Sequence, residues 1–523
     1  MLPYLQEVQN PSKKYTVLFR GLNYGEGTQD GEFAETYNLS TDEYPCITQR
    51  AERKRLEIYN KPSKLHSKGK LLVISDQFKD EEIDYSNVYY DRKFVGTVTS
   101  GKKQTATIGN YIVIFPDKKY YKVPTEDNPE GEFGSLEACY TSSGLKFTAS
   151  TISKADANFP FKEGDAVTIK GCSKTSNNMT AEIIIRDVSS DKTKLTFDDN
   201  AFVAIDNEEN EVTISRTVPD LDFICESNYR LWGTHGNTIY SSKFSDPFNF
   251  QVFDNLATDS YAIEVGSEGE FTGCIPYSSH ICFFKENTLH KLYGTKPSNF
   301  QITTANVYGV QSGSEGSMQI VNEQLLYKGV GGVYAYTGGV PELISEKFGN
   351  KRYSEAVACC DGEKYYISMK QGDSWNMFTY DVARNLWIRE DDTHAVDMTF
   401  YDGKVYYLDA EGGLYYIDKT ADRNDIEWGA TLCTMHETMN ERKGYSKFHL
   451  RMDLSAGAWL AVDIKTDNDL QWKEVYTTHN EKAKTVSIPI MPTRCDSIDI
   501  RLRGKGKCTI KTFVREFTVG SDV

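Results

Sequence analysis

Aspartates near predicted turns are the side chains of this chain that come closest to a catalytic pattern. Two carboxylates flanking a glycosidic bond can act as acid and as base or nucleophile, so paired acidic residues suggest glycoside hydrolysis. Turn formation already accounts for the Asp-Gly pairs at Asp361 and Asp402, because Asp favours such turns and Gly tolerates a positive φ. We therefore predict no catalytic residues and a protein that is not an enzyme. The candidates weighed are Asp361, Asp391, Asp392, Asp402 and Asp409.

Histidine and glycine patterns predict neither a metal site nor a cofactor site. The eight His residues are scattered, with no HExxH motif and no Cys/His spacing typical of zinc. His280 and His290 flank one predicted hairpin and could share a face, but a packing role is the simpler interpretation. The sequence has no GxSxG elbow, no GxxxxGK[ST] loop and no GxGxxG that opens a helix. Gly331 and Gly332 belong to a predicted hairpin turn.

Cysteine usage indicates a reducing environment, and hydropathy indicates neither a secretory signal nor a membrane span. The eleven Cys residues are odd in number, form no CxxC pair and include the adjacent Cys359 and Cys360, which favours free and mostly buried thiols. The first residues, MLPYLQEVQNPSKKY, lack the apolar core of a secretory signal. No run approaches the ~20 apolar residues of a membrane span. We expect a cytosolic site of synthesis and no membrane span.

The charge balance is acidic, with 59 Lys and Arg against 75 Asp and Glu and a formal net charge of -16. Proteins that bind nucleic acid through phosphates usually have the opposite sign or a basic stripe. Two basic clusters, Arg50–Arg55 and the group of Arg501, Arg503, Lys505 and Lys507, are predicted to be solvated faces. An acidic wall repels a passing duplex, so this charge suits a DNA conduit better than a DNA-binding protein.

Short aromatic hairpins recur along the chain. They predict the strands and turns that position the candidate aspartates and histidines. Most combine a β-branched or aromatic strand, a turn of Gly, Asn or Asp, and a second aromatic strand. A period of roughly 40 to 50 residues indicates a β-propeller, in which each four-stranded blade packs against its neighbours. We predict a mainly β protein with six or seven blades. The segments are Lys70–Ser75, Asn110–Lys122, Tyr229–Ser241, Ser279–Tyr293, Gln324–Tyr336, Glu363–Tyr380 and Lys404–Asp418.

Changes in the spacing of these hairpins predict the domain boundaries. Residues 1–57 form an N-terminal arm, which could donate the strand that completes the last blade. The propeller occupies residues 58–130 and 219–420. Between its two parts, residues 131–218 contain alternating strands and read as a small β-barrel or sandwich inserted at a blade loop. Residues 421–523 show alternating strands joined by polar loops, which indicates a C-terminal β-sandwich.

Two segments of the sequence are similar to one known family. Phe33–Arg50 contains an Asn-Leu-Ser stretch, then Tyr44-Pro45, and ends at Arg50; Pro219–Phe250 contains the Arg-Leu-Trp-Gly phrase from Arg230 and a Ser-Asp-Pro-Phe-Asn turn. Both resemble short-tailed phage proteins known as tail-nozzle or packaged-DNA stabilization proteins. The order and size of the predicted domains are also similar to those of that family.

The resemblance implies a structural virion protein of the phage tail, assembled in the host cytoplasm. It implies a homohexameric ring below the portal and its adaptor ring, which extends the DNA channel, retains packaged DNA, supports DNA ejection and carries fibres or a spike. DNA would pass through without sequence-specific binding. A closed ring needs two different complementary faces on each protomer. The inserted domain and the N-terminal arm are the candidates for these faces.

Two other interpretations remain open at this point. The chain could be a phage receptor-binding protein, a propeller that binds or cleaves glycans with aromatic platforms and carboxylates. No sugar-site pattern repeats from blade to blade, which counts against it. A cellular propeller that acts as a protein-interaction hub is the third interpretation, although the inserted domain and the C-terminal sandwich make it less economical.

Overall fold

Strands make up almost all regular structure in the computed structural model of this protein. The structure describes residues 10–520 except 77–84, 422–424, 438–440, 468, 483 and 492–493. Within them, the other regular elements are four short 3-10 turns: η1 (Thr175–Asn177), η2 (Pro297–Asn299), η3 (Glu315–Ser317) and η4 (Glu346–Phe348). No helix in these residues has the length and apolar character needed to cross a membrane. The chain divides into two units, residues 60–315 and residues 1–59 with 316–523.

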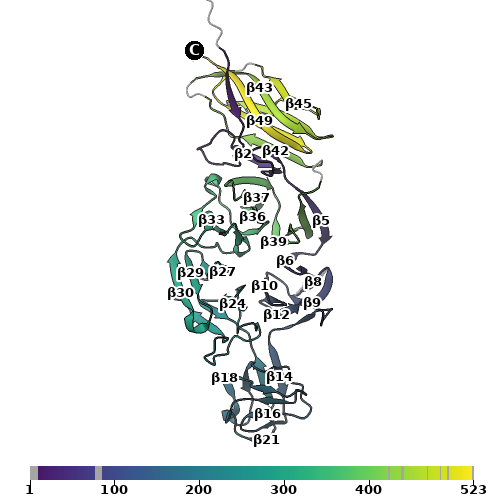
Figure 1. Ribbon diagram of the computed structural model, residues 1–523, viewed down its shortest axis with the longest axis vertical. Helices are drawn as coiled ribbons and strands as arrows, with labels where there is room; N and C mark the ends of the chain where they lie inside the picture. Colours follow the sequence, from purple (N-terminus) through teal and green to yellow (C-terminus); the bar gives the residue numbers. More distant parts are fainter. Residues whose placement is uncertain are drawn as a thin grey trace, which may run out of the picture. The chain divides into compact units, whose positions relative to one another are not determined.

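The unit of residues 60–315 contains four antiparallel sheets, each with its four strands in sequence order. These sheets are propeller blades (Figure 1). The first two are β6 (Pro62–Lys68), β7 (Lys70–Asp76), β8 (Tyr85–Tyr90) and β9 (Lys93–Thr99), then β10 (Gln104–Ile108), β11 (Tyr111–Phe115), β12 (Lys119–Lys122) and β13 (Glu132–Ser135). The next two are β23 (Phe223–Ser227), β24 (Arg230–His235), β25 (Thr238–Ser241) and β26 (Tyr261–Glu264), then β27 (Phe271–Tyr277), β28 (His280–Lys285), β29 (Thr288–Tyr293) and β30 (Gln301–Asn306).

The unit of residues 1–59 and 316–523 contributes three more blades. They are β31 (Gln319–Val321), β32 (Gln324–Gly329), β33 (Gly332–Tyr336) and β34 (Glu342–Leu343); β35 (Ala356–Cys360), β36 (Lys364–Gln371), β37 (Ser374–Asp381) and β38 (Leu386–Asp391); and β39 (Ala395–Tyr401), β40 (Lys404–Asp409), β41 (Gly413–Asp418) and β5 (Glu52–Ile58). The last blade takes its fourth strand, β5, from the N-terminal segment, as the sequence suggested. The described residues therefore contain seven blades, and the predicted propeller fold is confirmed.

Burial along the strands explains why these sequences form blades. The second strand of a blade is covered on both faces, so β28 (HICFFK) is buried along its whole length. The fourth strand lies at the outer edge, and β30 (QITTAN) is mostly exposed. Because burial decreases toward the outer edge, an apolar run forms an inner strand and a polar run forms the outer strand of the same blade. The six predicted hairpins form as expected, and the single strand Lys70–Ser75 lies in β7.

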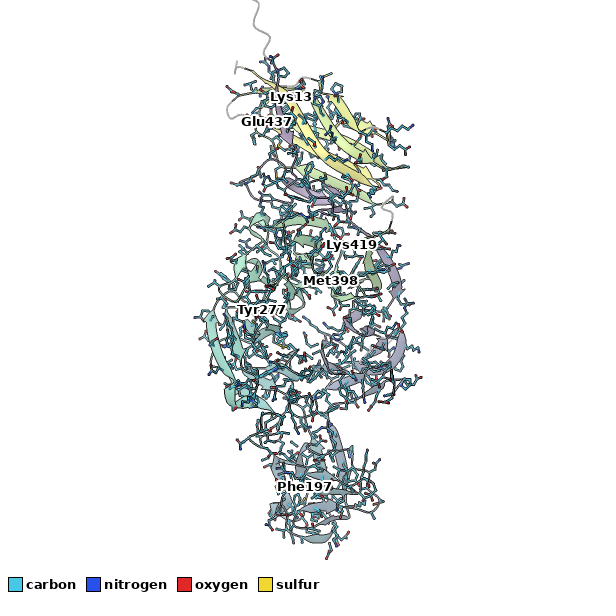
Figure 2. The ribbon with its side chains drawn as sticks, viewed as in Figure 1. Lys13, Phe197, Tyr277, Met398, Lys419 and Glu437 are labelled. Atoms are coloured by element: carbon cyan, nitrogen blue, oxygen red, sulfur yellow. The ribbon has the colours of Figure 1, made fainter. Side chains whose placement is uncertain are left out.

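A separate two-sheet domain connects the second and third blades of residues 60–315. One sheet has the order β14-β22-β17-β18 and the other β19-β20-β16-β15-β21. They share a core that includes Phe147, Phe159 and Phe197, the last labelled in Figure 2. The strands are β14 (Ala138–Ser142), β15 (Leu145–Phe147), β16 (Thr151–Ser153), β17 (Ala166–Lys170), β18 (Met179–Ile184), β19 (Asp187–Val188), β20 (Lys194–Thr196), β21 (Ile205–Glu208) and β22 (Val212–Arg216).

The predicted start of this inserted domain, residue 131, is wrong. Residues 132–135 form β13, which pairs with β12 and is the fourth strand of the second blade. Two glycines at the predicted boundary, Gly131 and Gly134, allow this strand pairing. Gly131 has a positive φ of 71°, and a Cβ at Gly134 would collide with the ring of Tyr120 on β12. The insertion accordingly begins at β14.

The C-terminal domain is a sandwich of two antiparallel sheets that also uses N-terminal strands. One sheet has the order β1-β49-β43-β46, with β47 also paired to β43; the other is β2-β42-β48-β44-β45. A short pair, β3 (Leu39–Ser40) with β4 (Thr48–Gln49), lies in the same N-terminal segment. The strands are β1 (Ser12–Thr16), β2 (Phe33–Tyr37), β42 (Glu427–Leu432), β43 (Lys443–Leu454), β44 (Trp459–Thr466), β45 (Lys473–Thr478), β46 (Thr485–Pro489), β47 (Arg494–Cys495), β48 (Ile498–Lys505) and β49 (Cys508–Val519).

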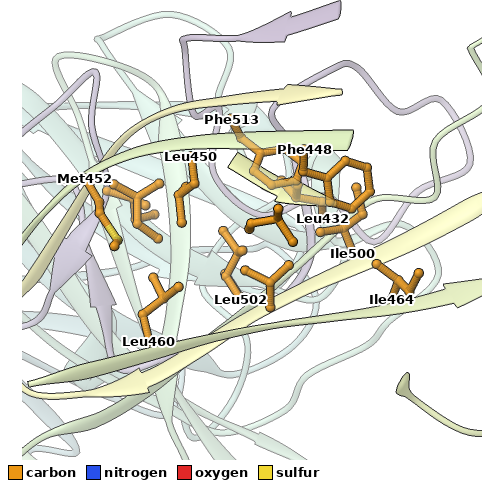
Figure 3. Packing of buried hydrophobic residues seen from close by; sticks show 14 of the residues in the cluster. Leu432, Phe448, Leu450, Met452, Leu460, Ile464, Ile500, Leu502 and Phe513 are labelled. Atoms are coloured by element: carbon orange, nitrogen blue, oxygen red, sulfur yellow. The ribbon is translucent and has the colours of Figure 1, made fainter. Parts of the chain in front are cut away.

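The N-terminal segment is thus not a separate arm over its described residues. β1 pairs with β49 and β2 with β42, so both strands complete sheets of the sandwich. Pairing of this kind covers a sheet edge that would otherwise expose unpaired backbone groups. The apolar faces of the two sheets enclose one core, shown in Figure 3; its labelled members are Leu432, Phe448, Leu450, Met452, Leu460, Ile464, Ile500, Leu502 and Phe513.

Candidate functional site

Two arginines of the basic run Arg50–Arg55 form buried ion pairs, so the prediction of a solvated face is wrong for Arg50 and Arg53, whereas Arg55 is exposed. The guanidinium of Arg53 on β5 lies 2.6 Å from Glu390 and 2.8 Å from Asp391, both on β38. Arg50 lies 3.6 Å from the same Asp391. Burial alone would lower the pKa of Arg53, but the two carboxylates hold it well above its usual value. These cations therefore join neighbouring blades and are not exposed to a ligand.

The segment Phe33–Arg50, called the N-terminal clamp below, joins a blade to the C-terminal domain. Asn38 sits at a positive φ of 53°, and its backbone N–H donates to the carbonyl of Glu390 on β38 at 2.6 Å. Its side-chain amide donates to the carbonyl of Glu427 on β42 at 2.8 Å. Its side-chain oxygen accepts from Arg50 Nε at 2.6 Å. One asparagine thus connects three elements, and Asn tolerates this backbone conformation better than most residues.

The segment Pro219–Phe250 fixes the inserted domain to the third blade. Asp165, at the start of the inserted domain's β17, is fully buried. It accepts from Arg216 Nη1 at 2.5 Å and from the amide of Asn249 at 2.9 Å. The side-chain oxygen of Asn249 accepts from the N–H of Ala166 at 3.0 Å. Asp165 and Arg216 both belong to the inserted domain, so the link to the blade is made by Asn249, through its bonds with Asp165 and with Ala166. Its bond to the Asp165 carboxylate is charge-assisted. We call Asp165, Arg216 and Asn249 the domain anchor.

The Arg-Leu-Trp-Gly phrase in the same segment has a packing role. Arg230 is 1% exposed, and it donates to the backbone carbonyls of Ser242, Asp259 and Ala257. The Trp232 ring lies in the core between the third and fourth blades. These contacts hold the loop after β25, and the guanidinium of Arg230 is used in bonds within the chain.

The aspartates named as catalytic candidates serve turns and ion pairs. Asp361 accepts from the hydroxyl of Tyr366 at 3.0 Å and from two backbone N–H groups of its own turn. Asp409 accepts from the N–H of Gly413 at 2.7 Å, and Asp402 holds a positive φ of 47° in the β39–β40 turn. Asp391 is bound to Arg53, and Asp392 pairs with Arg389. Four of these five carboxylates thus have a structural partner, and Asp402 forms a turn.

The two histidines of the fourth blade are packed between its strands. His290 Nε2 lies 2.8 Å from the hydroxyl of Ser267, and its Nδ1 lies 2.9 Å from the hydroxyl of Thr304. Burial lowers the pKa of His290 to about 4, and burial also lowers the pKa of His280. Over the part of the chain that the structure describes, no cluster of three His, Cys, Asp or Glu side chains is arranged to hold a metal ion.

The C-terminal basic group forms an ordered surface with two tryptophans. Asp463 on β44 is 2% exposed and accepts from Arg501 Nε at 2.9 Å and from Arg503 Nε at 2.8 Å, both on β48. The guanidinium of Arg501 lies 4.5 Å from the ring centroid of Trp472, and that of Arg503 lies 5.7 Å from that of Trp459. Hydrogen bonds from the two arginines hold the pKa of Asp463 below its usual value, although burial opposes them. We call these five side chains the arginine–tryptophan face.

The arginines of this face are ordered and partly exposed, and Arg503 also pairs with Glu474 on β45 at 2.7 Å. The side chains of Arg501 and Arg503 remain 33% and 36% exposed, so they are held in place yet accessible. Arginine and tryptophan are enriched among the residues that contribute most to protein–protein affinity. Cation–π contact and the shared aspartate fix the guanidinium groups before a partner arrives. The sequence pattern identified the two arginines but not their partners Asp463 and Trp459 on β44 and Trp472 just before β45.

Comparison with known proteins assigns no family to this chain. No protein-family model and no curated protein matches the sequence. The fold is a β-propeller. Among solved structures, BamB from Moraxella catarrhalis is 11% identical with a TM-score of 0.35, covering 72% of this chain and 98% of that chain. The phage phi92 endosialidase is 10% identical with a TM-score of 0.29, covering 88% of this chain and 81% of that chain.

Proposed function

We propose that this protein is a structural component of a short-tailed phage tail, a nozzle or hub ring below the portal and its adaptor. Its ring would extend the DNA channel, retain packaged DNA and support ejection, with fibres or a spike attached at its side. The observation that carries this proposal is that the two segments resembling the nozzle family both join domains. In the N-terminal clamp, Asn38 bonds to a blade and to the C-terminal domain, and in the domain anchor Asn249 of a blade bonds to Asp165 and Ala166 of the inserted domain.

Rigid fastening of domains is what such a role requires. A ring that retains DNA under pressure must transmit force between domains without letting them swing apart. Buried, charge-assisted hydrogen bonds with fixed geometry resist such motion better than exposed ion pairs, which contribute about 0–1 kcal/mol. The aspartates and histidines that could have supported an enzyme are used in turns, ion pairs and packing, which favours a non-enzymatic role.

The surfaces available for ring formation differ from those expected from sequence. Strands β1 and β2 are paired within their own chain, so they are poor candidates for a contact between protomers. We propose the arginine–tryptophan face in their place, with the inserted domain as the second candidate. The chain has a net charge of -16, so the partly exposed guanidinium groups of this face on one protomer are complementary to acidic surface on the next. Contacts between unlike faces are those that close rings.

Electron microscopy of the purified protein tests this proposal, alone and mixed with the adaptor ring of the phage that carries the gene. We expect closed rings that stack coaxially on the adaptor. Protein that stays monomeric at high concentration and does not associate with the adaptor would contradict a nozzle role. Native mass spectrometry of the same samples gives the number of protomers.

A further inference from the structure

A cavity of about 230 Å³ lies between the blade of β31–β34 and the blade of β35–β38. Its wall is made by the β32–β33 turn, by the segment from β34 through η4 to Tyr353, and by Met369 on β36. None of the residues discussed as the candidate functional site contributes to it. An engineered cavity of about 150 Å³ holds a benzene molecule, so this one has room for a small organic molecule.

One side of the cavity is cationic. Lys328, at the end of β32, is 1% exposed, and its Nζ donates to the carbonyl of Gly329. Lys351 and the exposed Arg352 line the same cavity, and Glu346 supplies the acidic group of the lining. Burial, and after it the positive charge of Arg352, lower the pKa of Lys328 to about 8. The positive charges of Lys328 and Arg352 repel each other, and an anion bound between them would stabilise both.

The other side is apolar and includes one hydroxyl group. Phe348 and Met369 are buried, and Val333 continues the same wall. The hydroxyl oxygen of Ser345 accepts from the N–H of Val333 at 2.9 Å, which leaves the hydroxyl hydrogen of Ser345 able to donate to a ligand. A cavity with convergent polar groups at one end and apolar side chains at the other is typical of small-molecule sites.

We propose that this cavity is a binding site for a small organic carboxylate with an apolar body. The carboxylate lies toward Lys328 and Arg352, and the apolar body packs against Phe348 and Met369. Inorganic phosphate has the charge but cannot use the apolar wall, and a neutral molecule of the same shape cannot use the cations. The site is therefore selective for the combination of the two properties.

Calorimetric titration of the full chain with benzoate tests the proposal, with benzamide and inorganic phosphate as matched probes. We expect one benzoate per chain, with benzamide and phosphate each binding at least tenfold more weakly. Absence of benzoate binding at millimolar concentration would overturn the proposal. So would equal binding of benzamide, which would make the cavity merely apolar, or equal binding of phosphate, which would make it merely cationic.

Three variants locate the site. Lys328→Met removes the buried charge at similar volume, and Arg352→Gln removes the exposed one; each is expected to weaken benzoate binding at least tenfold. Glu346→Gln removes an acidic group and is expected to leave binding unchanged or tighter. Because Met is apolar, Lys328→Met is expected to melt no lower than the parent chain, which separates loss of binding from loss of fold. Benzoate affinity unchanged in both Lys328→Met and Arg352→Gln would overturn the assignment.

Discussion

Buried ion pairs and exposed ion pairs in this chain differ in what they contribute to stability. In the domain anchor, the side chains of Asp165 and Arg216 are 0% and 7% exposed. Removing one partner of such a pair leaves the other charge buried and uncompensated, at a cost of about 3–5 kcal/mol. Lys146 and Asp206 form a surface pair in the same domain, with exposures of 53% and 94%, and pairs of that kind contribute about 0–1 kcal/mol.

Arg216→Leu should therefore lower the free energy of unfolding of the inserted domain by about 3–5 kcal/mol. Lys146→Leu, the matched control, should lower it by about 1 kcal/mol or less. Hydrogen exchange of β14–β22 during denaturant titration measures both effects. Equal effects of the two substitutions would contradict the importance assigned to the buried pair of Asp165 and Arg216.

His290 predicts a pH dependence of stability. Its folded-state pKa of about 4 lies below the usual value of 6.5, so the unfolded chain binds more protons between these values. Its contribution to stability is complete above pH about 6.5 and is lost as the pH falls toward 4, at up to about 1.4 kcal/mol per pH unit. In His290→Gln this loss should be absent, as measured by denaturant titration at pH 7, 6, 5 and 4.5. An unchanged pH profile in the variant would contradict the assignment.

At the scale of elements, local strands were predictable and distant strand partners were not. A hairpin such as β40–β41 combines alternation of aromatic residues with a Gly turn, both visible within fifteen residues or so. The pairing of β1 with β49 and of β2 with β42 joins opposite ends of the chain, and nothing in the local pattern identifies the partner. The contribution of β5 was predictable because a propeller commonly closes its last blade in this way.

The same limit explains the errors at the candidate site. Arg50–Arg55 reads as a solvated run because its charges stand close together in the sequence. Their partners Glu390 and Asp391 are more than three hundred residues away. Asp463 and Trp459, likewise, lie on a strand that precedes Arg501 and Arg503 by about forty residues. Composition showed which charges exist, but only the sheet order showed which of them meet.

Gly412 offers a test of the closure of the last blade by β5. Its φ is 99°, and a Cβ there would collide with the backbone carbonyl of Tyr59, just after β5. Gly403 has a φ of 71° with open space around its Cβ position. Both Ala substitutions incur the cost of a positive φ, about 1 kcal/mol or more, but only Gly412→Ala should also detach the end of β5. Faster hydrogen exchange in β5 and β41 for Gly412→Ala, and not for Gly403→Ala, is the expected result.

If Gly403→Ala loosened β5 as much as Gly412→Ala, backbone strain alone would explain both variants. The contact between Gly412 and Tyr59 would then have no special role in closing the blade. Thermal melting of both variants provides the comparison of overall stability.

At the scale of the whole molecule, the chain is acidic, and the arginine–tryptophan face presents two partly exposed guanidinium groups. Association between that face and the acidic surface of another copy should weaken as salt rises, because exposed charges are screened within about 8 Å at physiological ionic strength. The double substitution Arg501→Gln and Arg503→Gln should abolish ring formation, since Gln can still donate to Asp463 but carries no charge.

Lys484→Gln with Lys511→Gln is the matched control for this experiment. These two exposed lysines both contact Asp453 on the other sheet of the C-terminal domain, so the change in net charge is the same. Sedimentation velocity at 50 and 300 mM salt measures association in each case. Rings that persist in the Arg501/Arg503 variant, or that disappear equally in the lysine variant, would exclude the arginine–tryptophan face as the contact.

The most direct test of the nozzle role is deletion of this gene from the phage that carries it. Electron microscopy and nuclease protection then report on the particles that form. We predict heads that package DNA but leak it, with tails that end at the adaptor. Intact particles that retain DNA and fail only to adsorb to the host would contradict the nozzle role and favour a receptor-binding or glycan-binding propeller.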